Sequence, residues 1–415
     1  MLSHWKKCAK AGYSRPDAYE CKNQYAGKEI KCEVRKKKDS VVTVSFQRGT
    51  SGLAEKLIEQ RRQVEDTDKL EQILTLLEDR LCGPREIAKL ATFRPSAESV
   101  HHLKVLGELS GHEKEHVRVL ALRVIQRLAS TRVGRVAIKQ HGCLSQVERV
   151  SAGRRHPAGV KLAACEVLRT YASSSREGGR VLIESKGQSA KALIETASND
   201  NWPPKLRESC LGVLSRYLDG GTADKIMEYA PKFMIGLVEC LDVQEFEFDE
   251  EFQTEPDEED VLLHEGLVRV AIASLCVLKK ACLTKKARES ALETRRITSL
   301  LVPYLDSESV DIRRNVSSVL MSLSVDSTEK LDWVYTANLI RAVEREKDRL
   351  VLENLGRFVS NLCVLEKVRS KLREVKFSDV LDEIVSRFRD VDNDDEECSI
   401  KSICEDAKKA LAWDP

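Results

Sequence analysis

The sequence predicts an all-α fold in which helical repeats stack into an α-solenoid, and three observations support this prediction. The chain has 415 residues, of which 5% are aromatic, with 20 glycines and 10 prolines. Sheet-rich folds need more of these residues for turns and sheet faces, so their scarcity favours helices joined by short connections. Apolar residues recur at helical spacing almost without interruption from about residue 53. The third observation is an internal repeat with a period typical of helical repeat architectures.

The repeat contains one amphipathic helix that recurs six times, each copy with a single broad apolar stripe. The first two copies read VRVLALRVIQRLA and VKLAACEVLRTYA. The six copies lie at 117–129, 160–172, 206–218, 267–279, 312–324 and 351–363. Their first residues are 43, 46, 61, 45 and 39 positions apart, so one interval is longer than the others. Because a lone helix cannot bury its stripe, neighbouring copies are expected to stack.

A short motif that ends in glycine follows the first two copies. It reads GRVAIKQHG at 134–142 and GRVLIESKG at 179–187. Glycine after a short helix permits the positive φ that redirects the chain into the next helix. The order of apolar helix, Gly-Arg pair, glycine turn and second amphipathic helix resembles the armadillo repeat, most clearly over about 117–200. The resemblance implies a right-handed α-solenoid of armadillo/HEAT-like repeats.

The remaining helices follow from the same pattern. Second helices are expected at 144–150, 192–195, 233–241, 300–305 and 380–385. From 204 onward the resemblance is weaker, because Pro231, Ile297 and Leu339 stand near the place of the glycine, and HEAT-like geometry is the alternative there. Two less regular helix pairs are expected within 53–112 and a final helix at 397–413.

Charge divides the chain into an arm, a solenoid and an inserted loop. The 68 basic and 67 acidic residues give a net charge of +1, but they are unevenly distributed. Residues 1–52 are predicted to be a basic, poorly structured N-terminal arm, and 53–413 the solenoid. The ten carboxylates of 245–260 have no base among them, so they repel one another and stay solvated. They fall in the long interval, which predicts an acidic loop at 244–261 inserted between two repeats.

Catalytic motifs are missing from the sequence. It has no GxxxxGK[ST], no GxGxxG after a strand, no GxSxG, no HExxH and no CxxC pair. The sequence therefore predicts a protein that is not an enzyme and that uses no cofactor.

Three groups of residues superficially resemble metal sites. His112 and His116 have the i, i+4 spacing of a metal pair, but no third or fourth ligand can be named, so they are interpreted as polar residues at a helix start. The other two groups are Cys8, Cys21 and Cys32 with His4, whose spacings fit no zinc knuckle, and the acidic run 390–397, which lacks the central glycine of a calcium loop. No metal site is predicted.

The expected location is the cytoplasm, with the nucleus as the alternative. The 13 cysteines follow no regular spacing, and several lie in apolar helical runs, which indicates reduced thiols. No stretch approaches the length of a membrane-spanning apolar segment, and the first residues lack the apolar block of a signal peptide. The run 35–38 (RKKK) could contact nucleic acid or serve as an import signal, but no aromatic residue interleaves it, so nucleic-acid binding is not expected.

The resemblance also implies where a partner binds. In armadillo proteins the third helix of each repeat lines the concave groove, and in the nuclear-import adaptors a Trp and an Asn four residues later clamp a basic peptide. These positions correspond to Arg123, Arg127, Glu166, Thr170, Gly212, Arg216, Ala273, Val277, Ser318, Ser322, Arg357 and Asn361. Only Asn361 conforms to the adaptor pattern. Four of the twelve are arginines, which favours an acidic or phosphorylated segment, as in the β-catenin type of armadillo groove.

Two classes of function remain open at this point. The first is a non-enzymatic scaffold or adaptor whose predicted groove residues are Arg123, Arg127, Glu166, Thr170, Arg216, Arg357 and Asn361. The alternative is a regulatory armadillo domain that senses a small ligand such as a nucleotide, or a chaperone-linked assembly factor. The simpler interpretation of the arginines is a solvated helix face paired with neighbours such as Glu166. A further hypothesis is that the acidic loop 245–260 screens the groove from acidic partners.

Overall fold

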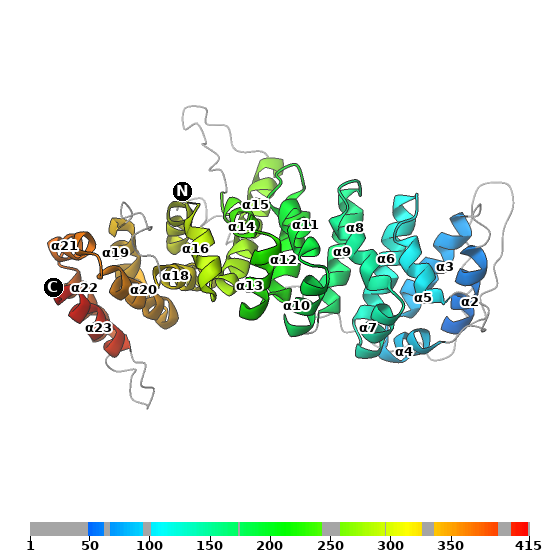
Figure 1. Cartoon of the computed structure of the whole chain (residues 1–415), viewed down its shortest axis with the longest axis horizontal. Helices are drawn as coiled ribbons and strands as arrows, with labels where there is room; N and C mark the ends of the chain where they lie inside the picture. Colours follow the sequence, from blue (N-terminus) through cyan, green and yellow to red (C-terminus); the bar gives the residue numbers. More distant parts are fainter. Residues whose placement is uncertain are drawn as a thin grey trace. The chain divides into compact units, whose positions relative to one another are not determined.

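The computed structural model describes residues 49–61, 67–93, 101–172, 175–242, 258–294, 296–325, 336–388 and 400–413. Every regular element in these ranges is a helix, and the helices belong to one compact unit that extends from Arg48 to Pro415 (Figure 1). Most of the predicted basic arm and the metal-site candidates at Cys8, Cys21 and Cys32 lie outside the described residues. The first described helix begins at Thr50, so the last three positions assigned to the arm belong to a helix.

Third helices, one from each repeat, pack side by side in chain order (Figure 1). They are α3 (Thr67–Arg80), α6 (Glu115–Ala129), α9 (Ala158–Tyr171), α12 (Pro204–Tyr217), α15 (Glu258–Ala281), α18 (Val310–Ser324), α20 (Arg349–Leu362) and α23 (Ile400–Ala412). Each of them contacts the next one along the row. The six helices predicted from the repeated segments are α6, α9, α12, α15, α18 and α20, so the helical repeat is confirmed.

The other helices connect these third helices. First helices are α4 (Pro84–Thr92), α7 (Arg132–Gln140), α10 (Ser175–Glu184), α13 (Gly220–Tyr229), α16 (Lys285–Leu292) and α21 (Glu366–Glu374). Second helices are α2 (Thr50–Arg61), α5 (His102–Leu109), α8 (Cys143–Ala152), α11 (Gln188–Ala197), α14 (Phe233–Glu239), α17 (Ile297–Leu301) with the 3-10 helix η2 (Val302–Asp306), α19 (Thr336–Arg345) and α22 (Phe377–Phe388). The expected second helix at 300–305 is therefore split into a short α-helix and a 3-10 turn around Pro303, which has no N–H to donate.

The turns between first and second helices have the geometry expected from the sequence in the two clearest repeats. Gly142 and Gly187 have φ values of 76° and 71°, in the left-handed region that glycine enters without strain. Lys376, the residue before α22, has a φ of 52° although it is not a glycine. At the start of the first helices, the side chains of three residues accept hydrogen bonds from backbone amides and so cap α7, α13 and α16; they are Thr131, Asp219 and Thr284.

The core consists of the apolar stripes of neighbouring helices. Leu168 and Leu320 occupy the same stripe position in two repeats and are 1% and 0% exposed, which confirms the register of the alignment. Helix α15 is the longest described helix, with 24 residues. Contrary to the expectation from the sequence, its segment Val261–Ala281 is long and apolar enough to cross a membrane by length and composition alone. Core helices have the same properties, and α15 packs against α12 and α18.

The predicted acidic loop ends earlier than expected. Residues 243–257 lie outside the described part of the chain, but α15 begins at Glu258. Residues 258–260 therefore belong to the first turn of this helix.

Candidate functional site

The predicted groove residues are exposed or half-buried on the third helices, and α6 holds two of the exposed ones. Arg123 and Arg127 are exposed and stand one helical turn apart on this helix. Neither forms a hydrogen bond or an ion pair with any described residue. Both guanidinium groups are therefore available for an added acceptor, such as a carboxylate or a phosphate.

The next third helix, α9, presents a different surface. Glu166 forms an ion pair with Arg169 at 2.6 Å, one turn away on the same helix. The hydroxyl group of Thr170 donates to the backbone oxygen of Glu166 at 2.8 Å. The side-chain amide of Gln126 on α6 donates to Thr170 Oγ1 at 3.5 Å, which links this face to that of α6. Because Glu166 is paired with Arg169, it does not compensate the positive charges of Arg123 and Arg127 on α6.

Arg216 on α12 has a structural contact that the sequence did not indicate. Its Nη1 donates to the backbone oxygen of Arg169 at 3.0 Å, near the C-terminal end of α9. Lys280 on α15 makes the same kind of contact one repeat later, with the backbone oxygen of Ser215. A cation at a helix C-terminus satisfies a free carbonyl and the negative end of the helix dipole. Arg216 therefore stabilises the packing of α12 against α9.

On α20, the two predicted groove residues also differ from each other. Arg357 is half-buried and has no partner among the described residues. Asn361 donates its side-chain amide to Ser324 Oγ on α18 at 2.8 Å, and Asn354 donates to Ser317 Oγ at 3.1 Å. These two Asn–Ser bonds join α18 to α20. The amide of Asn361 is already engaged between repeats, unlike an asparagine that is free to clamp a peptide.

The sequence interpretation missed a second set of basic residues. They are Arg118, Lys161, Arg207 and Arg313, each at the second position of a repeated segment. All four contact a connection that joins a second to a third helix. Lys161, for example, donates to Thr196 Oγ1 at 3.0 Å and stands 4.5 Å from the ring centre of Trp202. Their shared column in the alignment was the signal that could have identified them.

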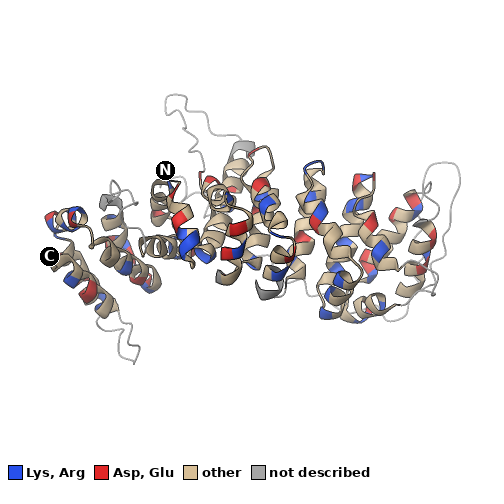
Figure 2. Cartoon of the chain, in the orientation of Figure 1, with Lys and Arg blue, Asp and Glu red and all other residues tan. Residues whose placement is uncertain are grey.

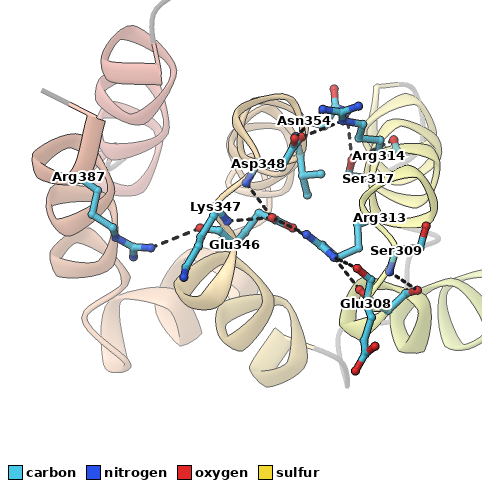
Figure 3. A network of polar contacts seen from close by, with 12 residues as sticks. Glu308, Ser309, Arg313, Arg314, Ser317, Glu346, Lys347, Asp348, Asn354 and Arg387 are labelled. Atoms are coloured by element: carbon cyan, nitrogen blue, oxygen red, sulfur yellow. Dashed lines mark hydrogen bonds and ion pairs between the residues drawn. The ribbon is translucent and has the colours of Figure 1, made fainter. Parts of the chain in front are cut away.

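Arg313 is also the centre of a polar network (Figure 3). The guanidinium group of Arg313 donates to both carboxylate oxygens of Glu346, at 2.7 and 3.1 Å, and the Glu346 side chain is only 3% exposed. Arg314 forms a second bidentate pair with Asp348, at 2.7 and 3.1 Å. Arg387 on α22 donates to the backbone oxygen of Glu346 at 3.4 Å. The network connects α18, α20 and α22.

The network controls the ionisation of its carboxylates. Burial acts to raise the pKa of Glu346, but hydrogen bonds from Arg313 and from the amides of Asp348 and Lys347 outweigh it, so this pKa is lowered. The hydrogen bond from Arg314 is the main reason that the pKa of Asp348 is lowered. Both carboxylates therefore stay ionised at neutral pH and serve the packing of repeats.

Within the described ranges, no three His, Cys, Asp or Glu side chains are arranged to hold a metal ion. His116 contacts the Glu71 carboxylate, and the Nδ1 atom of His112 accepts a hydrogen bond from the amide of Lys114 at 3.1 Å. The pair is thus occupied by local contacts.

A small apolar cavity lies between α20, α22 and α23. Its volume is about 10 Å³, and its lining includes Leu355, Phe377, Leu381 and Cys404. It has room for a single water molecule at most. This cavity is far too small for a nucleotide and offers no charged group to a phosphate.

Comparisons with known proteins identify the fold. No protein-family model and no curated protein sequence match the chain. A solved structure from work on a phosphorylation switch that controls the interaction between cadherin and beta-catenin is similar over 81% of this chain, with a TM-score of 0.58 and 12% identity, and the chain spans 60% of that protein's length. A designed armadillo repeat protein, YIII(Dq)4CqI, matches 66% of this chain and 99% of its own, with a TM-score of 0.49 and 14% identity. The first of these likenesses shows the fold, and the chain folds as an armadillo-type α-solenoid.

Proposed function

We propose that this protein is a binding scaffold or adaptor that recognises an acidic or phosphorylated protein segment on the outward face of α6 and its neighbours. The observation that carries the proposal is the pair Arg123 and Arg127, exposed, one turn apart and without a partner among the described residues. Two guanidinium groups on one helix face fit the carboxylates or the phosphate of an extended segment.

Residues on the neighbouring third helices add polar and positively charged groups to this surface. Thr170 and Gln126 contribute neutral hydrogen-bonding groups beside Arg127. Arg216 extends the positive charge toward α12, although its Nη1 is bound to the Arg169 carbonyl. Elsewhere, positive and negative side chains are interspersed along the described helices (Figure 2). The unpaired arginines of α6 are thus the feature that favours an anionic partner.

The test compares peptides and matched charge-reversal variants. Fluorescently labelled 15-residue peptides, which carry phosphoserine, serine or lysine at the central positions and are otherwise identical, are titrated against the full chain. We expect the phosphoserine peptide to bind most tightly, and its affinity to fall as salt rises because exposed charges are screened over about 8 Å at physiological ionic strength. R123E/R127E should reduce this affinity at least tenfold.

The matched control is R132E/R155E, which changes the net charge equally at two exposed arginines on α7 and in the α8–α9 connection. The control should bind the phosphoserine peptide like the wild type. Equal loss of affinity in both variants would show that only net charge matters, and no preference among the peptides would refute an anionic partner.

A further inference from the structure

Three histidine rings form a stack that joins two consecutive repeats near the N-terminus of the solenoid. The ring centres of His101 and His141 are 3.5 Å apart with an angle of 11° between their planes. His101 also stacks on His102, with centres 4.4 Å apart. His101 precedes α5, and His141 follows α7, directly before the glycine turn at Gly142. The stack therefore connects the start of α5 to the α7–α8 turn of the next repeat.

Two of the rings have a hydrogen-bonding state that a further proton would disrupt. The Nδ1 atom of His101 accepts a hydrogen bond from the Leu103 amide at 3.3 Å and so caps α5. A proton on this nitrogen would abolish the cap. The ring of His102 is 0% exposed, and its Nε2 lies 2.9 Å from the carbonyl oxygen of Leu90, so Nε2 carries the proton. Its Nδ1 is buried without a partner, and protonation there would create an N–H with no acceptor.

We propose that the stack of His101, His102 and His141 is a pH-sensitive clasp that holds the start of α5 and the α7–α8 turn together at neutral pH and opens on acidification. Two charged imidazoles at a separation of 3.5 Å repel each other, and a half-buried position gives them little solvent screening. Protonation therefore favours a state in which the rings are separated and exposed to water.

The described surroundings supply no opposite charge that would stabilise a protonated stack. Burial is the main cause that lowers the pKa of His101, and the charge of His141 lowers it further, against a backbone hydrogen bond with Phe93. Burial also lowers the pKa of His141, and it lowers the pKa of His102 to about 3, with added repulsion from both other rings. Among the described residues, the titratable groups that act on the three rings are the rings themselves.

The sign of the pH dependence follows. Because the pKa values of the folded rings lie below the ordinary value of about 6.5, the folded state binds fewer protons than the unfolded state. The contribution of the stack is constant above about pH 6.5 and decreases as the pH falls below that value. Opening is therefore expected in the range where histidine ordinarily becomes charged.

Amide hydrogen exchange on the full chain tests this inference. Exchange rates are measured at about pH 7.5 and pH 5.5, on either side of the ordinary histidine pKa, and converted to protection factors, which removes the intrinsic pH dependence of exchange. We expect protection of 103–105 and 141–142 to fall about tenfold at the lower pH, because pH 5.5 lies about one unit below the ordinary histidine pKa of about 6.5 and so favours the protonated, open form by about that factor. Protection in α20 should stay constant. Unchanged protection at 103–105, or an equal fall in α20, would overturn the proposal.

Two variants make the test specific. H101N/H141N removes both outer rings, while an asparagine side chain before α5 can still cap that helix and His102 keeps its bond to Leu90. The pH dependence of its protection should become smaller, because only His102 of the three rings remains. H112N, which removes a histidine outside the stack, should behave as the wild type. An equal pH effect in H101N/H141N and the wild type would refute the clasp. If that variant fails to fold, the pKa values of the three rings can be measured by NMR titration of the wild type. Ordinary pKa values for all three rings would refute the clasp.

Discussion

Glu148 illustrates how a single residue in a repeat junction carries a stability cost that depends on pH. Its side chain is largely buried on α8, and the hydroxyl group of Ser189 on α11 donates to its Oε1 at 3.3 Å. Burial raises its pKa to about 7; repulsion from Glu184 adds to this effect, whereas Ser189 and Lys139 oppose it. The carboxyl group is thus partly protonated at neutral pH.

We predict that E148Q stabilises the protein at about pH 8 and has little effect at about pH 4.5. The folded pKa is raised, so the favourable contribution of the protonated acid is complete below about pH 4.5 and is lost as the pH rises through about 7. Glutamine carries no charge and still accepts the Ser189 hydrogen bond. Urea unfolding should show a gain of about 1–2 kcal/mol at the higher pH, reduced for partial solvent exposure.

E113Q is the control for this experiment, because Glu113 is exposed in the connection before α6. It should leave the free energy of unfolding unchanged at both pH values. A gain in E113Q equal to that in E148Q would mean that net charge, and not burial, is responsible.

At the scale of the element, both long acidic segments lie between a second and a third helix. Residues 243–257 separate α14 from α15, and 389–399 separate α22 from α23; the structure of both segments lies outside the described residues. The equivalent connection between α8 and α9 consists of 153–157. Helix packing thus requires only a short connection at this place.

We predict that deletion of 245–257 leaves the solenoid folded, since 240–244 would then connect α14 to α15 with the same length as 153–157. If the acidic loop screens the predicted groove, the deletion should also strengthen the binding of an acidic peptide. Far-UV circular dichroism and thermal unfolding should match the wild type, within about 0.5 kcal/mol, because loop length contributes weakly to stability. Deletion of 153–157 should unfold the neighbouring repeats, and a similar loss in the first deletion would show that 245–257 pack as part of the fold.

At the scale of the whole molecule, the row of third helices predicts unfolding by regions. Each third helix contacts its neighbours in the row, so stability is a sum of terms for repeats and for their interfaces. L168A and L320A should each cost about 2–5 kcal/mol by cavity formation, since both side chains are buried.

Hydrogen exchange should locate these effects. L168A should reduce protection mainly in α6, α9 and α12, and L320A mainly in α15, α18 and α20. Uniform loss along the chain in both variants would indicate a single cooperative core instead.

The sequence alone determined the repeat, its register and the glycine turns. These features depend on local patterns: the apolar stripe recurs at helical spacing, and Gly142 and Gly187 provide a positive φ within the same short motif. The resemblance also suggested which residues line a groove, and that assignment stays a prediction. The sequence interpretation misjudged the end of the acidic loop, because helix propagation into 258–260 is favoured by the rest of α15.

Only the tertiary structure decided which of those residues are free. Arg216 and Asn361 are engaged by partners 47 and 37 positions away, in the preceding repeat, whereas Arg123 and Arg127 have none among the described residues. The histidine stack depends in the same way on His141, which is close to His101 only because two repeats pack together. A periodic sequence fixes which face each side chain occupies, but the contacts across that face form between helices, so their geometry follows from packing.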